Sequence, residues 1–522
     1  RLFGDHFFLF RLPSLFALPI YFFSVKYIVQ KTISSKLNVL VFLALVCIPW
    51  LFEYFSYARG YGMAIAFFFA AIASLIHWKT SRKLLHFASI LMCLWISVAS
   101  SLTYLFPSLL IVCYAILLFI LNKNFQKRIL LVTTTLILLW IFALLPFIRY
   151  SFELKEIGAL WWGNQDGLWE TTGKSMSRLA IFDDANWVFY LIASLLIFVA
   201  FSFLLSWRKV GFWNYLKQSE AILFLVFLGS VVGIVAMRYL LDVNYPMDRV
   251  GMYLVPLFML VIGVYLSKCQ WTKFGLIALC FLPISFLFKL NFSTSIFSPE
   301  DRIPTYLTNE IKSNLTDQIA LSAEYVSHMS YAYSCRNDEK VHIAYTGEQD
   351  EEFLGEYHIN WLGRYSRKGY SITAQDPESR TRVLKQTHFT TKKLIADTLI
   401  RSVNLTDIYL TIFDRQIDSS WQSSPVQVQI IAKMTMNQAS ARFNIIQTLE
   451  DANANQTRAS NPNFGWYFGD RKNVSFVYTD RMFELKPEET RFNFFLFNPD
   501  LKKIKIELIR VRIYQIDLKK SN

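Results

Sequence analysis

The feature that most constrains this chain is a succession of apolar runs through residues 1–290. Each run is about 17–22 residues long, which is enough for an α-helix to cross a bilayer. Helices suit this setting because every backbone group in lipid must find its hydrogen-bond partner within the protein. The sequence therefore predicts a polytopic α-helical membrane domain. We expect about ten helices, at residues 7–25, 37–56, 62–78, 84–104, 107–122, 129–149, 187–207, 221–241, 250–267 and 274–290.

The loops between these runs alternate in charge. One set is short and carries 14 basic residues with a single acid, Glu220, whereas the other set carries most of the acids. Short basic loops stay in the cytoplasm, so we expect the acidic loops, residue 1 and residues 291–522 on the outer side. An outward N-terminus predicts one further helix upstream of Arg1.

Charge and cysteine content exclude two classes of protein. Residues 1–290 hold 24 Lys and Arg against 11 Asp and Glu, whereas residues 291–522 hold 29 against 28. The basic excess thus belongs to the membrane half, and no soluble face offers the basic patch that nucleic acid needs. Five of the six cysteines lie in or at the end of apolar runs, and no CxxC pair occurs. Neither a disulfide framework nor a cysteine metal site is expected.

Residues 291–522 read as globular sequence. Residues 291–395 mix helical and strand patterns, such as "IPTYLTNEIKSNL" and "KVHIAYTG", which predicts an extracytoplasmic α/β module. Residues 396–522 contain period-two stretches separated by turn residues, which indicates a β-sandwich. Sandwich domains include sugar-binding and purely structural examples, and a fold does not dictate a function. Both roles therefore stay open.

Charged residues near the outer surface are the first candidates for function, because a charge close to lipid is costly. Arg59 stands in the short outward loop "EYFSYARGYG", against the positive-inside pattern, with Glu53 before it and Tyr61 after it. The arginine either snorkels to outer headgroups or grips a phosphate or sugar at the outer leaflet. Gly60 and Gly62 allow a backbone or a ligand to approach closely.

Three further arginines are expected at the same membrane surface. Asp248 and Arg249 stand at the outer mouth of a helix, in "NYPMDRVGMYLVPLF". Arg238 lies near the outer end of the preceding span, and Arg11 lies near the outer end of the first. A ring of arginines among acidic loops suits a membrane-borne anion with a polar partner.

The longest outward loop covers residues 150–186. Its pattern "IGALWW…GLW" predicts amphipathic helices in the membrane interface, with tryptophans at headgroup depth. Asp166, in "WGNQDG", is either a candidate acid on the acceptor side or part of a hydrated interface loop. A divalent metal ion is a possible cofactor for sugar transfer. The histidines are scattered and form no ligand set, so the metal stays unknown.

Three stretches, "LFGDHFFLFRLPSLFALPIYF", "ARGYGMAIAFFFAAIASL" and "YPMDRVGMYLVPLFMLVIGVYL", resemble the GT-C membrane glycosyltransferases. Within that group they are similar to bacterial relatives of protein O-mannosyltransferases and of the lipid A aminoarabinose transferase, over about residues 1–290. The resemblance implies a multi-pass enzyme of the bacterial inner membrane. Such an enzyme takes a sugar from a polyprenyl-phosphate donor on the periplasmic side and passes it to a protein, lipid or glycan acceptor.

The resemblance also implies site residues. Arg59, Tyr61 and Arg249 would line the lipid-phosphate and donor site. Further candidates, from their positions alone, are Glu53, Arg11, Arg238 and Asp248.

One departure from the family concerns the catalytic acid. In the family it lies in the first outward loop, after a first helix, and this chain begins at the end of that loop. Asp5 fits the preamble to the second helix, so we expect the catalytic residue upstream of Arg1 and none in this chain.

Two alternatives remain. One is a non-enzymatic transporter or polysaccharide-export component, although repeated halves and midplane polar residues are not evident. The other is an O-antigen-type ligase or polymerase, which usually carries a single large periplasmic loop and no C-terminal sandwich.

Overall fold

The computed structural model divides the chain into two compact units, Arg1–Leu290 and Asn291–Asn522, which are described separately below. The structure describes residues 7–33, 38–57, 59–121, 127–158, 163–181, 184–268, 279–289, 303–346, 354–360, 369–387, 389–422, 425–437, 443–460, 464–468, 471–499 and 501–519.

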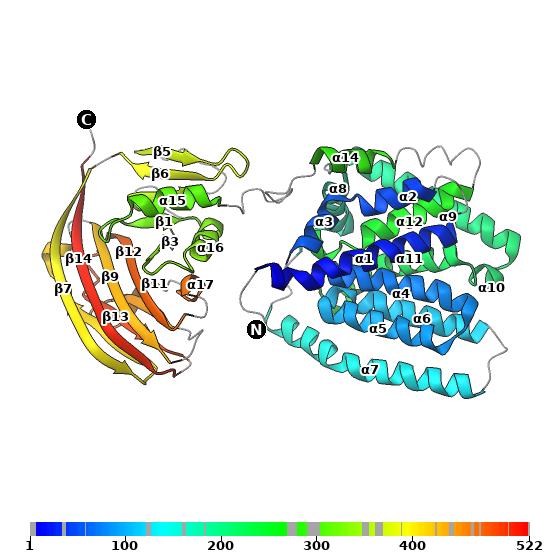
Figure 1. Cartoon of the computed structure of the whole chain (residues 1–522), viewed down its shortest axis with the longest axis horizontal. Coiled ribbons are helices and arrows are strands. Elements are labelled where there is room, and N and C mark those ends of the chain that lie inside the picture. Colours follow the sequence, from blue (N-terminus) through cyan, green and yellow to red (C-terminus); the bar gives the residue numbers. More distant parts are fainter. Residues whose placement is uncertain are drawn as a thin grey trace. The chain divides into compact units, whose positions relative to one another are not determined.

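The first unit is helical (Figure 1). Its long helices are α1 (Phe7–Thr32), α4 (Tyr61–Ser81), α5 (Leu84–Ser100), α6 (Leu105–Leu121), α7 (Lys127–Glu156), α9 (Asn186–Val210), α11 (Ser219–Leu241) and α12 (Leu254–Lys268). Its short helices are α2 (Asn38–Val46), α3 (Pro49–Ser56), α8 (Lys174–Ile181), α10 (Phe212–Tyr215) and α14 (Phe281–Lys289). Single turns occur at η1 (Leu102–Tyr104), η2 (Leu168–Gly173, a π-helix) and η3 (Asp248–Val250).

Six of the described helices are long and apolar enough to cross a membrane, and the number rises to seven if α2 and α3 form one span. The predicted fold class, a polytopic helical membrane protein with a sheet-rich C-terminal region, is confirmed. Nine of the ten expected segments are helical along most of their length. The tenth, residues 274–290, is described only from residue 279, and α14 covers its last part.

Three boundaries differ from the prediction. The expected helix at 37–56 is bent by 48° between α2 and α3, because Pro49 begins α3 and lacks the N–H that an unbroken helix would need. The helix expected at 129–149 continues to Glu156, where Arg149 pairs with Glu153 at 2.9 Å one turn later. In the loop of residues 150–186, which is predicted to face outward and is called the outward loop below, the helical segment lies at 168–181. The expected tryptophan-rich segment lies partly outside the described residues.

Small residues let α4 pack at the centre of the first unit. Most of α4 is buried against α1 and α5, whereas α7 and α9 expose most of their apolar side chains, as a lipid-facing helix does. A Cβ added to Gly60 would lie 2.1 Å from the Ser100 carbonyl oxygen, and one added to Gly62 would lie 2.8 Å from the Ser14 hydroxyl. These two glycines therefore serve close packing of backbone against backbone and side chain.

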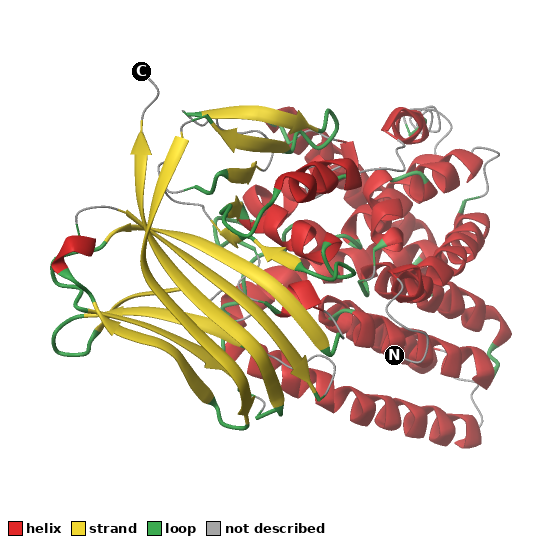
Figure 2. Cartoon of the chain, turned by 60° about the vertical axis from the view of Figure 1, so that its left-hand side comes forward, coloured by secondary structure: helices red, strands yellow, loops and turns green. Residues whose placement is uncertain are grey.

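The second unit contains three sheets (Figure 2). The first has the order β3 (Tyr345–Thr346), β1 (Leu321–Ala323), β4 (Tyr357–Asn360), β6 (Arg382–Gln386), β5 (Tyr370–Gln375). The second has the order β2 (Val341–Ile343), β12 (Asn473–Glu484), β9 (Pro425–Met436), β14 (Ile504–Lys519), β7 (Phe389–Leu405). The third has the order β11 (Gln456–Ser460), β10 (Asn444–Glu450), β13 (Arg491–Phe497), β8 (Tyr409–Gln416).

The first of these sheets carries helices α15 (Thr305–Asn314) and α16 (Tyr325–Ser334), and β1 pairs in parallel with β3 and β4. The other two sheets share one apolar core as a sandwich. The side chain of Gln447 in β10 donates to the Asp480 carboxylate of β12 at 2.6 Å across that sandwich. The boundary expected at residue 395 falls inside β7, and β2 pairs with β12. The helix–sheet part and the sandwich are therefore continuous through the second sheet.

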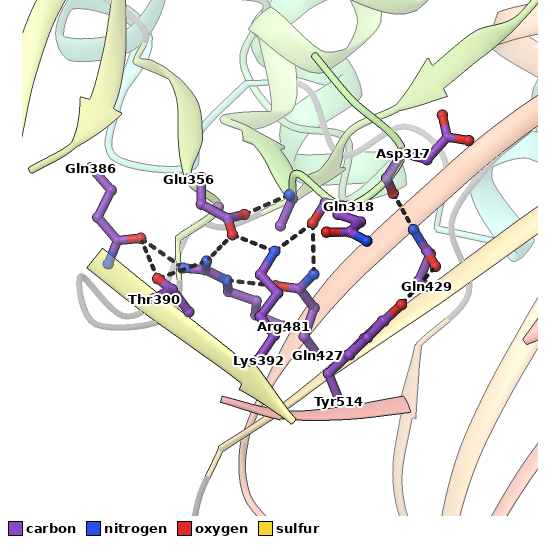
Figure 3. A network of polar contacts seen from close by, with 12 residues as sticks. Asp317, Gln318, Glu356, Gln386, Thr390, Lys392, Gln427, Gln429, Arg481 and Tyr514 are labelled. Carbon is purple, nitrogen blue, oxygen red and sulfur yellow. Dashed lines mark hydrogen bonds and ion pairs between the residues drawn. The ribbon is translucent and has the colours of Figure 1, made fainter. Parts of the chain in front are cut away.

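A buried polar network joins these two parts (Figure 3). The fully buried guanidinium of Arg481 in β12 pairs with Glu356, which precedes β4, at 2.8 Å. Lys392 of β7 pairs with the same carboxylate at 2.5 Å, and the backbone N–H of Ala320 donates to it at 2.6 Å. Burial alone raises the pKa of a carboxyl, but the charges of Arg481 and Lys392 hold the pKa of Glu356 below its usual value.

Glutamine side chains extend this network. Gln427 donates to the Gln318 carbonyl at 3.0 Å, and Gln429 donates to the Asp317 carbonyl. Tyr514 donates in turn to the side-chain oxygen of Gln429 at 3.3 Å. These hydrogen bonds hold the loop that precedes β1 to β9. Strand β14 supports that contact through its hydrogen bond to Gln429.

We predict that Arg481→Met destabilises the second unit by about 3–5 kcal/mol, because Glu356 then stays buried with one of its two cationic partners missing. Pulse proteolysis of the full-length protein in urea measures the change. Arg510→Met is the matched control, since its pair with Asp397 is partly exposed and Arg512 also pairs with Asp397. Its removal should therefore cost much less. Equal losses in the two variants would contradict the role given to the buried pair.

We predict a pH dependence from His328 in α16. Burial lowers the pKa of this imidazole from its ordinary value to about 4, and the Ala344 backbone opposes the shift. The folded state therefore disfavours the protonated ring. As the pH falls from about 6.5 towards 4, the unfolded chain takes up a proton that the folded chain does not, so stability falls by about 3 kcal/mol. Urea unfolding across this range should lose that slope in His328→Phe.

Candidate functional site

The structure brings two of the predicted site residues together. The Arg249 guanidinium, in η3, lies over the ring of Tyr61 at 5.9 Å from its centroid. Tyr61 is the first residue of α4. Its ring meets the ring of Tyr54 at 5.5 Å, and Tyr54 meets Tyr57 at 5.8 Å, both edge to face. We call Tyr54, Tyr57, Tyr61, Asp248 and Arg249 the rim cluster. An arginine held on a tyrosine ring is oriented and less hydrated, which suits it to an anion.

Asp248 is fastened from the outward loop. The Ser175 hydroxyl of α8 accepts the Asp248 backbone N–H at 2.5 Å and donates to its carboxylate at 3.0 Å. Arg178, one turn further along α8, pairs with the same carboxylate at 3.4 Å. Asp248 has a φ of +50°, which a residue with a side chain adopts only when neighbours hold it there. The fastening of Asp248 therefore also sets the direction in which Arg249 leaves the backbone.

A second hydrogen bond joins the same two segments. The Thr172 hydroxyl of η2 donates to the Pro246 carbonyl at 2.7 Å, and the added Cβ of Gly251 would lie 3.3 Å from Met176. Helix α8 also packs against α3 and α12. The outward loop is thus part of the wall of the rim cluster.

Arg59 lies beside this cluster in sequence and exposes its side chain. Its backbone carbonyl accepts the Ser14 hydroxyl of α1 at 3.2 Å. Arg11, also exposed, lies one turn before Ser14 on α1. Glu53, in α3, accepts the Tyr57 hydroxyl at 3.3 Å. The two arginines therefore share the α1–α4 edge, and Glu53 supports a ring of the cluster.

Arg238 and Asp166 form a separate group. Arg238, near the end of α11, pairs with Asp242 and donates to the Gln165 side chain at 2.8 Å. Asp166 accepts from Asn164, whose backbone carbonyl accepts the Tyr245 N–H at 2.9 Å. These contacts brace the outward loop against the segment after α11.

Among the residues that the structure describes, no group of three or more His, Cys, Asp or Glu side chains is placed to hold a metal ion. At and beside the rim cluster, Arg59, Arg178 and Arg249 supply positive charge, and Asp248 supplies the negative charge with which Arg178 pairs.

Sequence reasoning missed Ser175, Arg178 and Thr172, which hold the outward loop to the rim cluster. A signal for them exists: "KSMSRLAI" is a short amphipathic helix that buries Met176 and Leu179 on one face. The tryptophans and Asp166 are the features on which the prediction for this loop depends. A hydroxyl that binds a distant backbone leaves no periodic mark in the sequence.

Comparisons with known proteins give no family. No family model matches this chain, and no curated protein matches it. The cryo-EM structure of arabinosyltransferase EmbB from Mycobacterium smegmatis aligns with 97% of this chain and 57% of its own, at 9% identity and a TM-score of 0.27. The VP2 subviral particle of infectious bursal disease virus aligns with 34% of this chain and 46% of its own, at 8% identity and a TM-score of 0.17. The chain spans about half the length of these structures, and likenesses of this size carry no argument about function.

We predict that Ser175→Ala increases hydrogen exchange at the Asp248 amide by about tenfold, because that N–H then lacks its acceptor. Exchange mass spectrometry on peptides covering residues 244–252 measures it. Ser177→Ala is the matched control, since the Ser177 hydroxyl is also buried on α8 but donates to Gly173, a carbonyl of the adjoining η2 turn. Unchanged exchange in Ser175→Ala would disprove the fastening of Asp248.

Proposed function

We propose that this protein is a membrane glycosyltransferase of the GT-C type, which moves a sugar from a polyprenyl-phosphate carrier to an acceptor on the outer side of the bacterial cytoplasmic membrane. The observation that carries the proposal is Arg249 lying on Tyr61 in the rim cluster. These two residues belong to two of the three stretches on which the GT-C resemblance depends.

The rim cluster supports a phosphate ligand in particular. A guanidinium presents a planar set of N–H donors that matches phosphate oxygens, and an aromatic ring below it keeps it oriented. Tyr54, Tyr57 and Tyr61 have apolar rings and polar tips. A polyprenyl phosphate is likewise part apolar and part polar, with an apolar chain in the bilayer and a charged head at the bilayer surface. Arg59 and Arg11 extend the positive charge along the same edge.

The partners of Asp248 remove an obstacle to this role. A carboxylate next to Arg249 would repel a phosphate if it pointed at the ligand. Ser175 and Arg178 hold that carboxylate towards α8 instead. The negative charge is thereby directed into the wall rather than towards a ligand at Arg249.

The proposed reaction is a displacement at the anomeric carbon. An acceptor hydroxyl gives its proton to a carboxylate base and forms the new C–O bond. The bond between the anomeric carbon and the phosphate oxygen breaks, and polyprenyl phosphate leaves with the electron pair. Arg249 and Arg59 stabilise the charge that develops on that leaving phosphate. We assign the base to no residue of this chain.

We predict that Arg249→Ala weakens binding of undecaprenyl phosphate by at least tenfold, because a charge-assisted contact worth about 1.5–3 kcal/mol is lost. Arg249→Lys should recover only part of it, since an ammonium lacks the planar donor set. Arg59→Ala should also weaken binding. Titration of the purified protein in nanodiscs, followed by native mass spectrometry, measures the dissociation constants.

Arg149→Ala is the control for these variants. Arg149 is an exposed arginine near the end of α7 that already pairs with Glu153, and we expect its removal to leave the dissociation constant unchanged. Binding that survives in both Arg249→Ala and Arg59→Ala would remove the rim cluster from the donor site. Binding lost equally in Arg149→Ala would show only a response to total charge.

A further inference from the structure

The outward face of the four-stranded sheet in the second unit is divided into an aromatic half and a polar half. Strand β13 buries Phe492, Phe494 and Leu496 in the core, so the residues between them point to the other side of the sheet. Register places four rows on that side across β10, β13 and β8: Asn444–Phe497–Tyr409, Ile446–Phe495–Thr411, Thr448–Asn493–Asp414 and Glu450–Arg491–Gln416. We call these rows the outer face.

The first two rows form an aromatic platform. The ring of Tyr409 is stacked on that of Phe497, with centroids 5.1 Å apart and planes 22° apart. Phe495 meets Tyr409 edge to face at 5.7 Å. Tyr409 nevertheless stays 56% exposed. The contacts thus fix the ring in one orientation while leaving much of its surface open, as an aromatic binding residue requires.

The third row carries hydrogen-bonding atoms that lack partners. Thr448 and Asn493 are 4% and 9% exposed. The Thr448 hydroxyl and the Asn493 side-chain oxygen have no hydrogen-bond partner among the described residues, although the Asn493 amide donates to Glu450 at 2.7 Å. Burying such an atom without a partner destabilises the folded state. Neighbouring side chains enclose both atoms in this structure, so a ligand hydroxyl reaches them only when those side chains turn aside. Two such atoms in one row, opposite each other across paired strands, are the positions at which a ligand that brings hydroxyl groups would be held.

The fourth row closes the polar end. Arg491 forms a two-bond ion pair with Asp414, at 2.7 and 2.6 Å, and lies 3.9 Å from Glu450. Its charge is thus balanced on the face itself. The outer face therefore carries one net negative charge, from Asp414 and Glu450 against Arg491, which disfavours an anionic partner. Its apolar side chains are confined to the first two rows.

We propose that the outer face binds an oligosaccharide. A sugar ring has weakly polar C–H faces that cover an aromatic ring, and hydroxyl groups at its edge that donate and accept hydrogen bonds. At ~3.3 Å per residue, the Tyr409 row and the Asn493 row lie about 13 Å apart along β13. A chain of two or more sugar rings is therefore long enough to extend from the aromatic platform to the row of Thr448 and Asn493. This proposal is separate from the transferase function, because every residue in it belongs to the second unit and no donor takes part.

Saturation-transfer NMR on the full-length protein in nanodiscs tests the proposal, with lipids that carry no sugar headgroup. The probes are maltotriose, mannotriose, galactotriose and triacetylchitotriose, each added alone. We expect at least one to receive saturation. Tyr409→Ala should weaken its dissociation constant at least tenfold, and the near-isosteric Thr448→Val should weaken it about three- to tenfold.

Leu394→Ala is the matched control, because Leu394 is a similarly exposed apolar residue, at 49%, on β7 of the other sheet. It should leave sugar binding unchanged. Absence of saturation transfer to all four trisaccharides would overturn the proposal, as would binding that persists in both Tyr409→Ala and Thr448→Val. Loss of undecaprenyl phosphate binding in rim-cluster variants bears on the other proposal alone, so the two fail independently.

Discussion

A backbone amide in hydrocarbon has no water to bond, and leaving it without a partner costs several kcal/mol. The first unit therefore consists of helices, and its polar chemistry gathers where helices stop. Tyr57 directly follows the last residue of α3, and Tyr61 is the first residue of α4. Asp248 and Arg249 lie in the turn before α12. At such ends, backbone groups and charged side chains reach water or each other. The rim cluster is a consequence of where the membrane permits helices to break.

The two units handle buried charge in different ways. In the first, the partly exposed Asp248 carboxylate accepts a hydrogen bond from Ser175 and forms an ion pair with Arg178, both from α8. The neighbouring Arg249 guanidinium lies over the ring of Tyr61. In the second, Arg481 is fully buried and is satisfied by a carboxylate and by carbonyl and amide oxygens from two strands and a loop. Removing one partner is costly there, because no water can replace it. The first arrangement can meet a ligand, whereas the second holds β-structure together.

Much of the fold was predictable, for local reasons. Apolar length and loop charge predicted the helices, and alternation predicted β9, β12, β13 and β14. The bend at Pro49 was visible as a proline inside an apolar run and was missed, because apolar length outweighed it. The pairing of β2 with β12 was not predictable, because the alternation of apolar and polar residues predicts a strand but not the strand with which it pairs. For the candidate site, Arg249 and Tyr61 were identified by resemblance, but Ser175 and Arg178 were not, because polar residues in a long loop resemble any solvated loop.

The sequence by itself determined which segments are long and apolar enough to enter lipid and which short loops between them carry charge, because hydrophobic length and charge are local properties of the chain. Only the tertiary structure decided that Ser175 meets Asp248 across 73 residues, that Arg249 lies on Tyr61, and that Tyr409 stacks on Phe497. Each of these contacts depends on how whole helices and strands pack. Packing is fixed by the combined shape of many side chains, and no short stretch of sequence contains it.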